Sequence, residues 1–457
     1  MPSADPGDSG RPCATDTIAA IATPPGRGGI GVVRISGPAA PALARAVLGR
    51  IPAARHAGLC TVRDGQGAAL DEGIALYFEA PHSYTGEPVL EFQGHGGPVV
   101  MREVLNAFLD AGARLAQPGE FTQRAFLNER LDLAQAEGVA DLIDASSREA
   151  ARSALRSLRG EFSAAIHALV ESLTELRALI EAMLDFPEDE IDALHREDSR
   201  ARLEALRRAL EDVLARSREG SLLRSGVNVV LTGRPNVGKS SLLNRLAGED
   251  RAIVTAVPGT TRDALRETIL IEGVPINIID TAGLRESRDE IERLGIERTR
   301  KELAQADVVL LVLDASAGFL PDDRLLQADL PPDCRKIQVL NKSDLVPAGS
   351  MPVFPESPAS LRVSAKTGAG LEGLRGAVLR AAGWHTHGET VYLARERHLR
   401  ALARARRHLE SATEHTDRWE LLAEELRLAQ AALSEITGEF TTEDLLGEIF
   451  ARFCIGK

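Results

Sequence analysis

Gly233-Arg234-Pro235-Asn236-Val237-Gly238-Lys239-Ser240 is the stretch that decides the fold. It has the spacing G-x-x-x-x-G-K-S of a P-loop. The apolar run 227–231 before it is typical of a buried strand, and residues 241–246 after it are typical of a helix. A strand, a glycine-rich loop and a helix in this order predict an α/β domain that holds phosphates with backbone N–H groups and Lys239, and Mg²⁺ with Ser240.

Three further segments follow in the order that a GTPase requires. Asp280-Thr281-Ala282-Gly283 places an Asp near the Mg²⁺ shell and a Gly N–H near the γ-phosphate. Asn341-Lys342-Ser343-Asp344 offers a carboxylate that accepts both N–H donors of a guanine edge, a pairing that adenine cannot make. Ser364-Ala365-Lys366 is placed to contact the guanine carbonyl by its backbone. All three end strand-like runs, and ligands of open α/β sheets bind at that end, so the segments predict GTP binding.

Length and composition restrict the possible organisation, partners and location of the whole chain. Its 457 residues exceed one ordinary domain, so we expect two or three. The net charge of −13 argues against a generally basic surface, so an RNA partner would need a local basic patch or a basic partner subunit. Four scattered cysteines without metal-ligand spacing suit a reducing cytosol. No apolar run is long enough to cross a membrane, and the start resembles neither a signal nor a transit peptide, so a cytoplasmic location is expected.

The pattern along the chain predicts a multidomain protein. Residues 1–16 read as a polar tail, and 17–128 as a compact α+β domain of short strands and helices. Helical patterns fill 129–225 and 383–457, and the P-loop G domain occupies 226–382. Because each helical flank looks too thin to bury its apolar stripe alone, we expect one all-α domain with the G domain inserted; the alternative is two separate helical domains.

Two long helices are predicted before the G domain. An apolar stripe from Leu155 to Met183 indicates one continuous helix, which Pro187 ends. A second helix is predicted over Glu197–Ser217, and Gly220 and Gly226 are expected to bracket a short linker. After the G domain, helices are predicted over 393–414 and 417–437.

Switch I of a GTPase is expected in Thr255-Ala256-Val257-Pro258-Gly259-Thr260-Thr261-Arg262-Asp263. Thr261 is our choice for the hydroxyl that meets Mg²⁺, with Thr260 as its rival, because spacing alone does not separate them. Leu284 stands where Ras-like proteins carry the glutamine that orients water, and a leucine cannot do this. The candidates to replace it, unless they form only a solvated acidic turn, are Glu286, Asp289, Glu290 and Glu292.

Six further blocks lie outside the G motifs, which many GTPases share, and those near the N-terminus and the terminal tetrapeptide are much more specific than the G motifs. They are Thr23-Pro24-Pro25-Gly26-Arg27-Gly28-Gly29, Gln93-Gly94-His95-Gly96-Gly97, Phe126-Leu127-Asn128, Leu131-Asp132-Leu133-Ala134-Gln135-Ala136-Glu137, Leu422-Ala423-Glu424-Glu425-Leu426-Arg427 and Cys454-Ile455-Gly456-Lys457. With the P-loop and Gly259–Asp263, these blocks resemble the MnmE (TrmE) tRNA-modification GTPases over essentially the whole chain after the tail.

The resemblance implies an N-terminal domain that binds a tetrahydrofolate one-carbon donor, as 5-formyl- or methylene-tetrahydrofolate, and forms a homodimer. It implies a flavoprotein partner of the MnmG (GidA) type, which alone would carry FAD. Together they would add an aminomethyl or carboxymethylaminomethyl group at C5 of the wobble uridine of certain tRNAs. It also implies that K⁺ stimulates GTP hydrolysis, during which G domains transiently dimerise.

The resemblance further assigns roles to individual residues. Ser240 and Thr261 match Mg²⁺ ligands, which favours Thr261 over Thr260 for that role. Glu292 matches the acid that positions the attacking water through a second water, and with Lys239 it is the expected catalytic group. K⁺ ligands match Asn236, Thr255, Val257 and Thr260. Folate contacts match Arg34, Glu91, Lys457 and Arg130, the last standing where we expect a Lys in some relatives. The remaining expected GTP contacts are Val237, Gly238, Ser241, Asp280, Thr281, Ala282, Gly283, Asn341, Lys342, Asp344, Ser364, Ala365 and Lys366.

Two alternatives stay open at this point. Cys454 is a candidate nucleophile for the tRNA chemistry, but a buried or site-lining small residue explains it as well, because only Lys457 stands near enough in sequence to activate the thiol. The whole chain could instead be a regulatory or ribosome-assembly GTPase whose flanking domains are interaction modules. Binding of a reduced folate, with Lys457 present and absent, separates the two functions.

Overall fold

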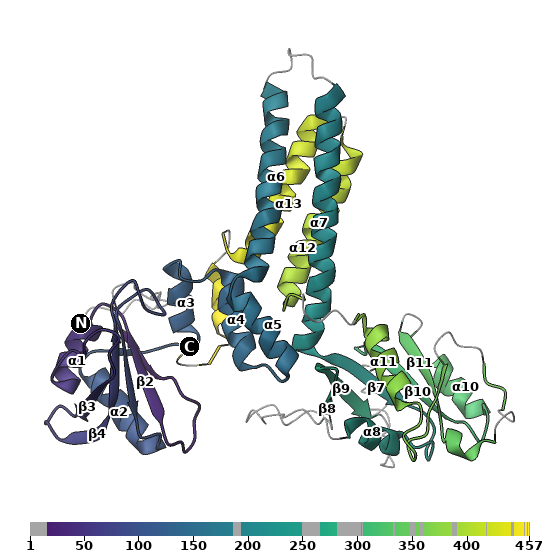
Figure 1. Cartoon of the computed structure of the whole chain (residues 1–457), viewed down its shortest axis with the longest axis horizontal. Coiled ribbons are helices and arrows are strands. Elements are labelled where there is room, and N and C mark those ends of the chain that lie inside the picture. Colours follow the sequence, from purple (N-terminus) through teal and green to yellow (C-terminus); the bar gives the residue numbers. More distant parts are fainter. Residues whose placement is uncertain are drawn as a thin grey trace, which may run out of the picture. The chain divides into compact units, whose positions relative to one another are not determined.

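A computed structural model gives the arrangement of the chain (Figure 1). It describes residues 16–185, 193–248, 266–280, 303, 305–331, 334–347, 352–355, 360–385, 391–416, 418–439, 443–451, 453–454 and 456. The chain forms two compact units. One comprises Met1–Ala140 with Ser434–Lys457, and the other comprises Asp141–Leu433.

The first unit is built on a mixed six-stranded sheet, with strand order β3-β4-β5-β2-β1-β6. Its core contains Val33 and Ile35 of the sheet, together with Val104 and Phe108 of α2. This α+β architecture confirms the predicted class. The elements are β1 (Ile18–Ile21), β2 (Gly31–Ser36), α1 (Ala40–Leu48), β3 (Gly58–Arg63), β4 (Ala69–Phe78), β5 (Val89–Gly94), α2 (Pro98–Asp110) and β6 (Arg114–Leu115). The sequence pattern missed β3 and β6, because β3 is an edge strand with exposed Leu59 and β6 has two residues.

The last residues of the chain pack within this first unit. α3 (Glu120–Leu127), α4 (Leu133–Ile143) and α14 (Glu443–Phe450) share an apolar cluster. In it, the ring of Phe450 lies 6.4 Å from that of Phe126 and 5.4 Å from that of Phe453, measured between centroids. The end of the chain is therefore placed beside the N-terminal sheet.

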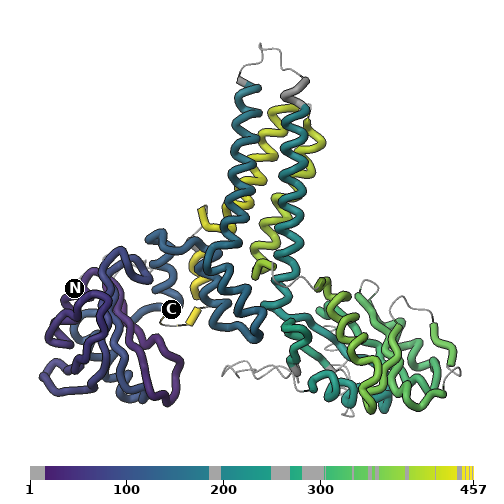
Figure 2. The backbone as a smooth tube through the Cα atoms, viewed as in Figure 1, coloured from purple at the N-terminus to yellow at the C-terminus, as the bar shows by residue number. Residues whose placement is uncertain are grey.

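Helices from both sides of the G domain pack together in the second unit. They are α5 (Arg148–Leu158), α6 (Glu161–Asp185), α7 (Ala193–Ser225), α12 (Glu396–Glu414) and α13 (Trp419–Thr437). Figure 2 shows α12 and α13 running beside α6 and α7. The Arg177 side chain on α6 donates a hydrogen bond of 2.6 Å to Gln430 on α13. The helical domain is thus continuous across the inserted G domain, as the sequence predicted.

Two predictions about these helices are wrong. The stripe from Leu155 to Met183 is not one helix, because Gly160, with φ of +86°, separates α5 from α6. No linker begins at Gly220, because α7 continues to Ser225. A Cβ at Gly220 would collide with the carbonyl oxygen of Tyr392, so this glycine allows the returning chain to approach the helix.

The G domain contains a second mixed sheet, with strand order β12-β11-β10-β7-β9-β8. All neighbouring pairs are parallel except β8 with β9. The central strands β7 and β10 are almost wholly buried, and the run of Val and Leu in β10 is typical of parallel sheets covered on both faces. The elements are β7 (Val227–Thr232), α8 (Lys239–Ala247), β8 (Arg266–Ile271), β9 (Val274–Asp280), β10 (Val308–Asp314), α10 (Pro321–Ala328), β11 (Arg335–Asn341), η2 (Ser343–Leu345), β12 (Ser360–Arg362) and α11 (Leu371–Ala382).

Candidate functional site

The P-loop follows β7 and turns sharply into α8. Gly233 and Gly238 have φ of +153° and +93°, and Asn236 between them has φ of +63°. A Cβ at Gly233 would collide with the carbonyl of Val312 on β10, and one at Gly238 would collide with the amide of Asn341. Both glycines therefore allow close approach as well as the turn. The loop presents Asn236 exposed, and Ser240 and Ser241 are exposed at the start of α8.

Lys239 is held inside this loop. Its side chain is buried and its Nζ donates to the carbonyl oxygens of Gly233 and Arg234, at 2.8 and 2.9 Å. Arg234 is in turn fixed by an ion pair of 2.7 Å from its Nε to Oδ1 of Asp323. Asp323 is fully buried and also accepts from the Leu320 N–H at the start of α10. The sequence pattern did not single out this pair, which ties the P-loop to α10.

Asn341 connects three of the predicted motifs. Its side-chain Nδ2 donates to the carbonyl of Val237 at 2.8 Å, and its Oδ1 accepts from the N–H of Ala365 at 3.0 Å. The side chain is buried, so these bonds satisfy its amide within the protein. The P-loop and the loops after β11 and β12 are therefore brought to one end of the sheet.

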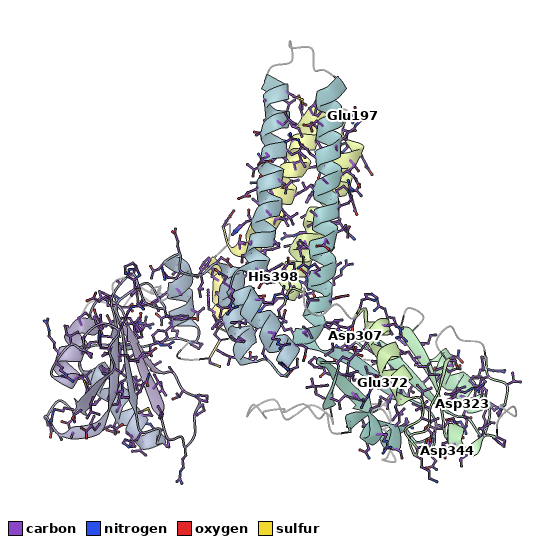
Figure 3. All side chains as sticks on the ribbon, in the orientation of Figure 1. Glu197, Asp307, Asp323, Asp344, Glu372 and His398 are labelled. Carbon is purple, nitrogen blue, oxygen red and sulfur yellow. The ribbon has the colours of Figure 1, made fainter. Side chains whose placement is uncertain are left out.

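Asp344 lies exposed after β11 (Figure 3). The hydroxyl of buried Ser364 donates to its Oδ1 at 2.6 Å, and the same hydroxyl accepts from the N–H of Thr367 at 3.1 Å. The carboxylate is oriented by the loop that contains Ser364, Ala365 and exposed Lys366. The loop that is expected to contact the guanine carbonyl therefore also orients the carboxylate of Asp344.

Lys342, between Asn341 and Asp344, pairs with a residue that the sequence pattern did not mark. Its Nζ lies 2.7 Å from Oδ2 of Asp314, the last residue of β10. Burial raises the pKa of Asp314, but the hydrogen bonds from Lys342 and Ser316 outweigh this effect and hold that pKa below its ordinary value. The Asp314 carboxyl is therefore ionised at neutral pH, and its contact with Nζ restrains Lys342, whose backbone has φ of +61°.

Asp280 is the last described residue before a gap that contains several predicted site residues. It ends β9 at the predicted edge of the sheet, next to β7. The residues outside the described ranges are Thr255, Val257, Thr260, Thr261, Thr281, Ala282, Gly283, Leu284, Glu286, Asp289, Glu290, Glu292 and Lys457.

Arg34 and Glu91, two of the predicted folate contacts, form a cross-strand pair in the first unit. They are register partners on β2 and β5, and Arg34 Nε lies 2.7 Å from Glu91 Oε1. The guanidinium lies over the rings of Tyr84 and Phe121, at 5.4 and 5.7 Å from their centroids. Its Nη1 donates to the carbonyl of Gly456 at 3.1 Å. The strand pair and the terminal tetrapeptide thus meet at one guanidinium.

Glu91 also lines a cavity of about 290 Å³. Arg130, a third predicted folate contact, lines the same cavity, with Tyr84, Arg55 and His82. Burial raises the pKa of Tyr84, and its hydroxyl is hydrogen-bonded to Thr122 at 2.8 Å, so it stays neutral. The pocket combines a carboxylate, cationic groups and aromatic faces, and its size is near the lower limit of small-molecule sites. The sequence did not point to Arg55, His82 or Tyr84, which lie in irregular segments without periodic signal.

A buried ionic network supports this region. Arg124 is 6% exposed and Glu120 is 1% exposed, and their side chains pair at 3.0 Å. Arg114 also pairs with Glu120, and Asp16 pairs with both arginines. Asp16 was expected to end the polar tail, yet it is part of this network. Burial raises the pKa of Glu120, but hydrogen bonds from Arg114, the Gln117 N–H and Arg124 keep it below its ordinary value.

Cys454 is exposed, and its carbonyl accepts from the N–H of Gly119 at 3.4 Å. That bond holds the backbone of the terminal segment beside α3, two residues before Gly456, which Arg34 contacts.

None of the described helices is long and apolar enough to cross a membrane.

Two family models match the chain. One, described as GTP-binding protein TrmE N-terminus, matches residues 17–130, and the other, described as MnmE helical domain, matches residues 133–454. Relatives named tRNA modification GTPase MnmE are 58% identical in Nitrosospira multiformis, over 97% of this chain and 99% of the relative, and 59% identical in Thiobacillus denitrificans, over 97% and 98%. Among solved structures, the G domain of the T. maritima FeoB iron transporter is 27% identical, covering 34% of this chain and 98% of that chain with a TM-score of 0.24.

Proposed function

The chain belongs to the MnmE family of tRNA modification GTPases, and from this premise we propose how its two sites divide the work. The G domain hydrolyses GTP with Mg²⁺ and is stimulated by K⁺. The N-terminal unit binds a reduced folate and contributes to the modification of the wobble uridine in certain tRNAs. A regulatory or ribosome-assembly GTPase was the alternative, and the family membership decides against it.

Asp344 and Ser364 support guanine selectivity. The Ser364 hydroxyl holds one carboxylate oxygen of Asp344 at 2.6 Å, so the carboxylate is already oriented before a base binds. An oriented carboxylate accepts from the two N–H donors of a guanine edge as a charge-assisted pair. Asn341 keeps this recognition element at a fixed position relative to the P-loop. Guanine binding and phosphate binding are therefore linked through one buried amide.

Lys239, Ser240 and Asn236 are the described groups that would serve phosphate and metal ions. Lys239 is buried at the base of the loop, where its ammonium can exchange loop carbonyls for phosphate oxygens. The Ser240 hydroxyl suits Mg²⁺, with Thr261 as the second protein ligand. The exposed amide oxygen of Asn236 suits a weakly held monovalent cation, and Thr255, Val257 and Thr260 complete the proposed K⁺ shell. When bound, both ions neutralise charge that develops on the transferred phosphate.

Glu292 is the proposed group that positions the attacking water, because Leu284 offers no polar atom to do so. A carboxylate orients water by accepting a hydrogen bond, and it does not need to remove a proton before the transition state. Asp280, Thr281, Ala282 and Gly283 are the proposed Mg²⁺ and γ-phosphate contacts between the strand and this acid.

The folate proposal is carried by one observation, the meeting of Arg34, Glu91 and the chain terminus. Glu91 faces a cavity as a carboxylate, the form that accepts from the amino and ring N–H groups of a pterin. Arg130 in the same cavity and Lys457 at the terminus supply positive charge for the acidic tail of a folate. These residues bind and orient the donor, which when bound supplies the one-carbon unit; Cys454 stays a candidate for the chemistry.

The proposed partners are a second copy of the chain, a flavoprotein of the MnmG (GidA) type that carries the FAD, and tRNA. Leu59 and Ile74 support a homodimer formed by the first unit. They are register partners on β3 and β4 and are 65% and 42% exposed, an apolar pair that a second copy would cover. A cytoplasmic location is proposed with these partners.

The deciding experiment measures binding of 5-formyl-tetrahydrofolate to the full chain and to a variant without Lys457. Submicromolar or micromolar binding that weakens at least about tenfold without Lys457 supports the site, because a charge-assisted pair contributes roughly 1.5–3 kcal/mol. Equal binding by both proteins removes Lys457 from the site. No binding by either protein, while GTP hydrolysis is intact, ends the folate proposal.

A further inference from the structure

α5 has two faces of opposite character. Ala150, Ser153, Ala154 and Ser157 are buried on one side. Arginines recur on the other side at positions 148, 152 and 156, and Arg159 follows at the C-cap. At 100° per residue, these four positions fall within an arc of about 80°, centred opposite the buried residues. The solvent face of α5 is therefore a row of guanidinium groups, with Leu155 as its one large apolar side chain.

Three of these arginines have no acidic partner among the described residues. Arg148, Arg152 and Arg159 are exposed, and no ion pair joins them to the described part of the chain. Arg156 pairs with Glu161 at 2.6 Å, and Glu149 is turned toward Gly273 at the edge of the helix. The row therefore keeps a positive excess at Arg148, Arg152 and Arg159.

Several exposed arginines on other helices of the same unit are paired within their own helix. Arg202 pairs with Asp198, Arg400 with Glu396 and Arg427 with Glu424, each three or four residues away on its own helix. Such pairs cancel their own charge, which is the ordinary arrangement on a solvated helix. α5 departs from it in a chain whose net charge is −13.

We propose that the solvent face of α5, formed by Arg148, Arg152, Arg156 and Arg159, is a docking surface for the phosphate backbone of tRNA. The proposal rests on the tRNA-modification function. An acidic protein repels RNA at long range, so binding needs a local surface of opposite charge. With a rise of 1.5 Å per residue, guanidinium groups four residues apart start about 6 Å apart, and the row extends about 16 Å. That length can follow several consecutive phosphates.

Guanidinium groups suit this role better than ammonium groups. Each presents a planar fork that binds phosphate oxygens in pairs. Phosphate contacts position an RNA without reading its sequence. This matches an enzyme that must hold more than one tRNA while the base chemistry takes place elsewhere.

The test compares two charge-reversal variants of the full chain. Arg148→Glu/Arg152→Glu changes the α5 face, and Arg202→Glu/Arg427→Glu makes the same change in net charge at paired surface arginines. Binding of an unmodified tRNA transcript is measured by fluorescence anisotropy from 50 to 200 mM salt. We expect the α5 variant to bind at least about tenfold more weakly at low salt, and its slope of log K against log salt to fall by roughly one per lost phosphate contact. The control keeps the wild-type slope.

Two further measurements keep the result interpretable. Arg148→Lys/Arg152→Lys keeps the charge and is expected to retain most of the salt slope, which assigns the loss in the glutamate variant to charge, and circular dichroism of the glutamate variant checks that it is folded. Intrinsic GTP hydrolysis is expected to be unchanged in every variant. The surface proposal is overturned if the α5 and control variants bind tRNA with the same affinity. It is also overturned if the α5 variant binds tRNA normally and has lost only its binding to the flavoprotein partner. If the wild-type chain itself neither binds nor modifies tRNA, the proposed tRNA-modification function is contradicted, and not only the role of α5.

Discussion

Arg34 on the second strand donates a hydrogen bond of 3.1 Å to the carbonyl oxygen of Gly456, the penultimate residue of the chain. The same guanidinium pairs with Glu91. The hydrogen bond to Gly456 therefore joins two residues of the first unit that are 422 positions apart in sequence. Gly456 has φ of +96°, and a Cβ there would approach the backbone of Ile21 and Ala22, so a side chain is excluded at this contact.

Deletion of residues 454–457 is the first prediction. It should abolish folate binding and tRNA modification, because it removes Lys457 and the carbonyl that Arg34 binds. GTP hydrolysis without partners should stay within about twofold of wild type, since the G domain makes none of these contacts. Glu91→Ala should give the same pattern, whereas Glu79→Ala, a carboxylate away from the cavity, is the matched control. Modification that persists in the deletion variant would exclude the tail from the site.

Asp344→Asn is the second prediction. It should weaken GTP binding roughly ten- to a hundredfold, because a charge-assisted pair is lost, and it should improve binding of xanthosine triphosphate. Ser364→Ala should have a smaller effect in the same direction, since it removes only the hydroxyl that orients Asp344. Isothermal titration with both nucleotides and with ATP measures this. Equal ATP and GTP affinities in the wild type would contradict guanine recognition.

The nucleotide motifs could be located in the sequence because each is local. A P-loop needs two glycines and a lysine at fixed spacing, and the strand ends that carry the other motifs are apolar runs of four to seven residues. The ionic connections among these motifs were not predictable. Asp314 at the end of β10 and Asp323 on α10 become partners of Lys342 and Arg234 only when these elements pack in the folded domain.

The errors in the helical domain have the same physical origin. Gly220 looks like a helix breaker, and a glycine inside a helix costs about 1 kcal/mol relative to alanine. It is retained within α7 because the backbone at Tyr392 approaches it, a tertiary contact that the local sequence does not reveal. The break at Gly160 was hidden because leucines continue with helical spacing on both sides of it.

Asp141→Asn is the third prediction, and it concerns stability. Asp141 on α4 is 7% exposed and pairs with Arg224 at the end of α7 and with Arg395 before α12. Removing its charge weakens the ionic contacts of both arginines, which should cost roughly 1–3 kcal/mol after allowance for the partial exposure of Arg224. The midpoint of urea unfolding followed by circular dichroism should fall. Asp198→Asn, at an exposed pair, should lower the free energy of unfolding by less than about 0.5 kcal/mol.

Asn236→Ala is the fourth prediction. Hydrolysis by the wild type should be faster in K⁺ than in Na⁺ at equal ionic strength, because the smaller ion fits the amide and switch-loop oxygens poorly. The variant should lose this difference while nucleotide affinity changes little, since Asn236 is exposed on the loop and the proposed phosphate contacts are backbone N–H groups and Lys239. Steady-state rates in the two chloride salts measure the effect. Identical wild-type rates in both salts would rule out the K⁺ mechanism.

Glu292→Ala is the fifth prediction and tests how water is positioned. Leu284 occupies the place of the Ras-like glutamine and has no polar atom, so another side chain must orient the attacking water, which Glu292 is proposed to do through a second water. If Glu292 does so, its removal should lower kcat by about ten- to a hundredfold, since one hydrogen bond to a charged group contributes roughly 1.5–3 kcal/mol. KM should change little, which is the pattern of a group that acts in the transition state. Glu292→Gln should recover part of the rate, because an amide oxygen still accepts. Glu286→Ala and Asp289→Ala, in the same acidic segment, are the controls, and a wild-type rate in Glu292→Ala would transfer the role to one of these neighbours.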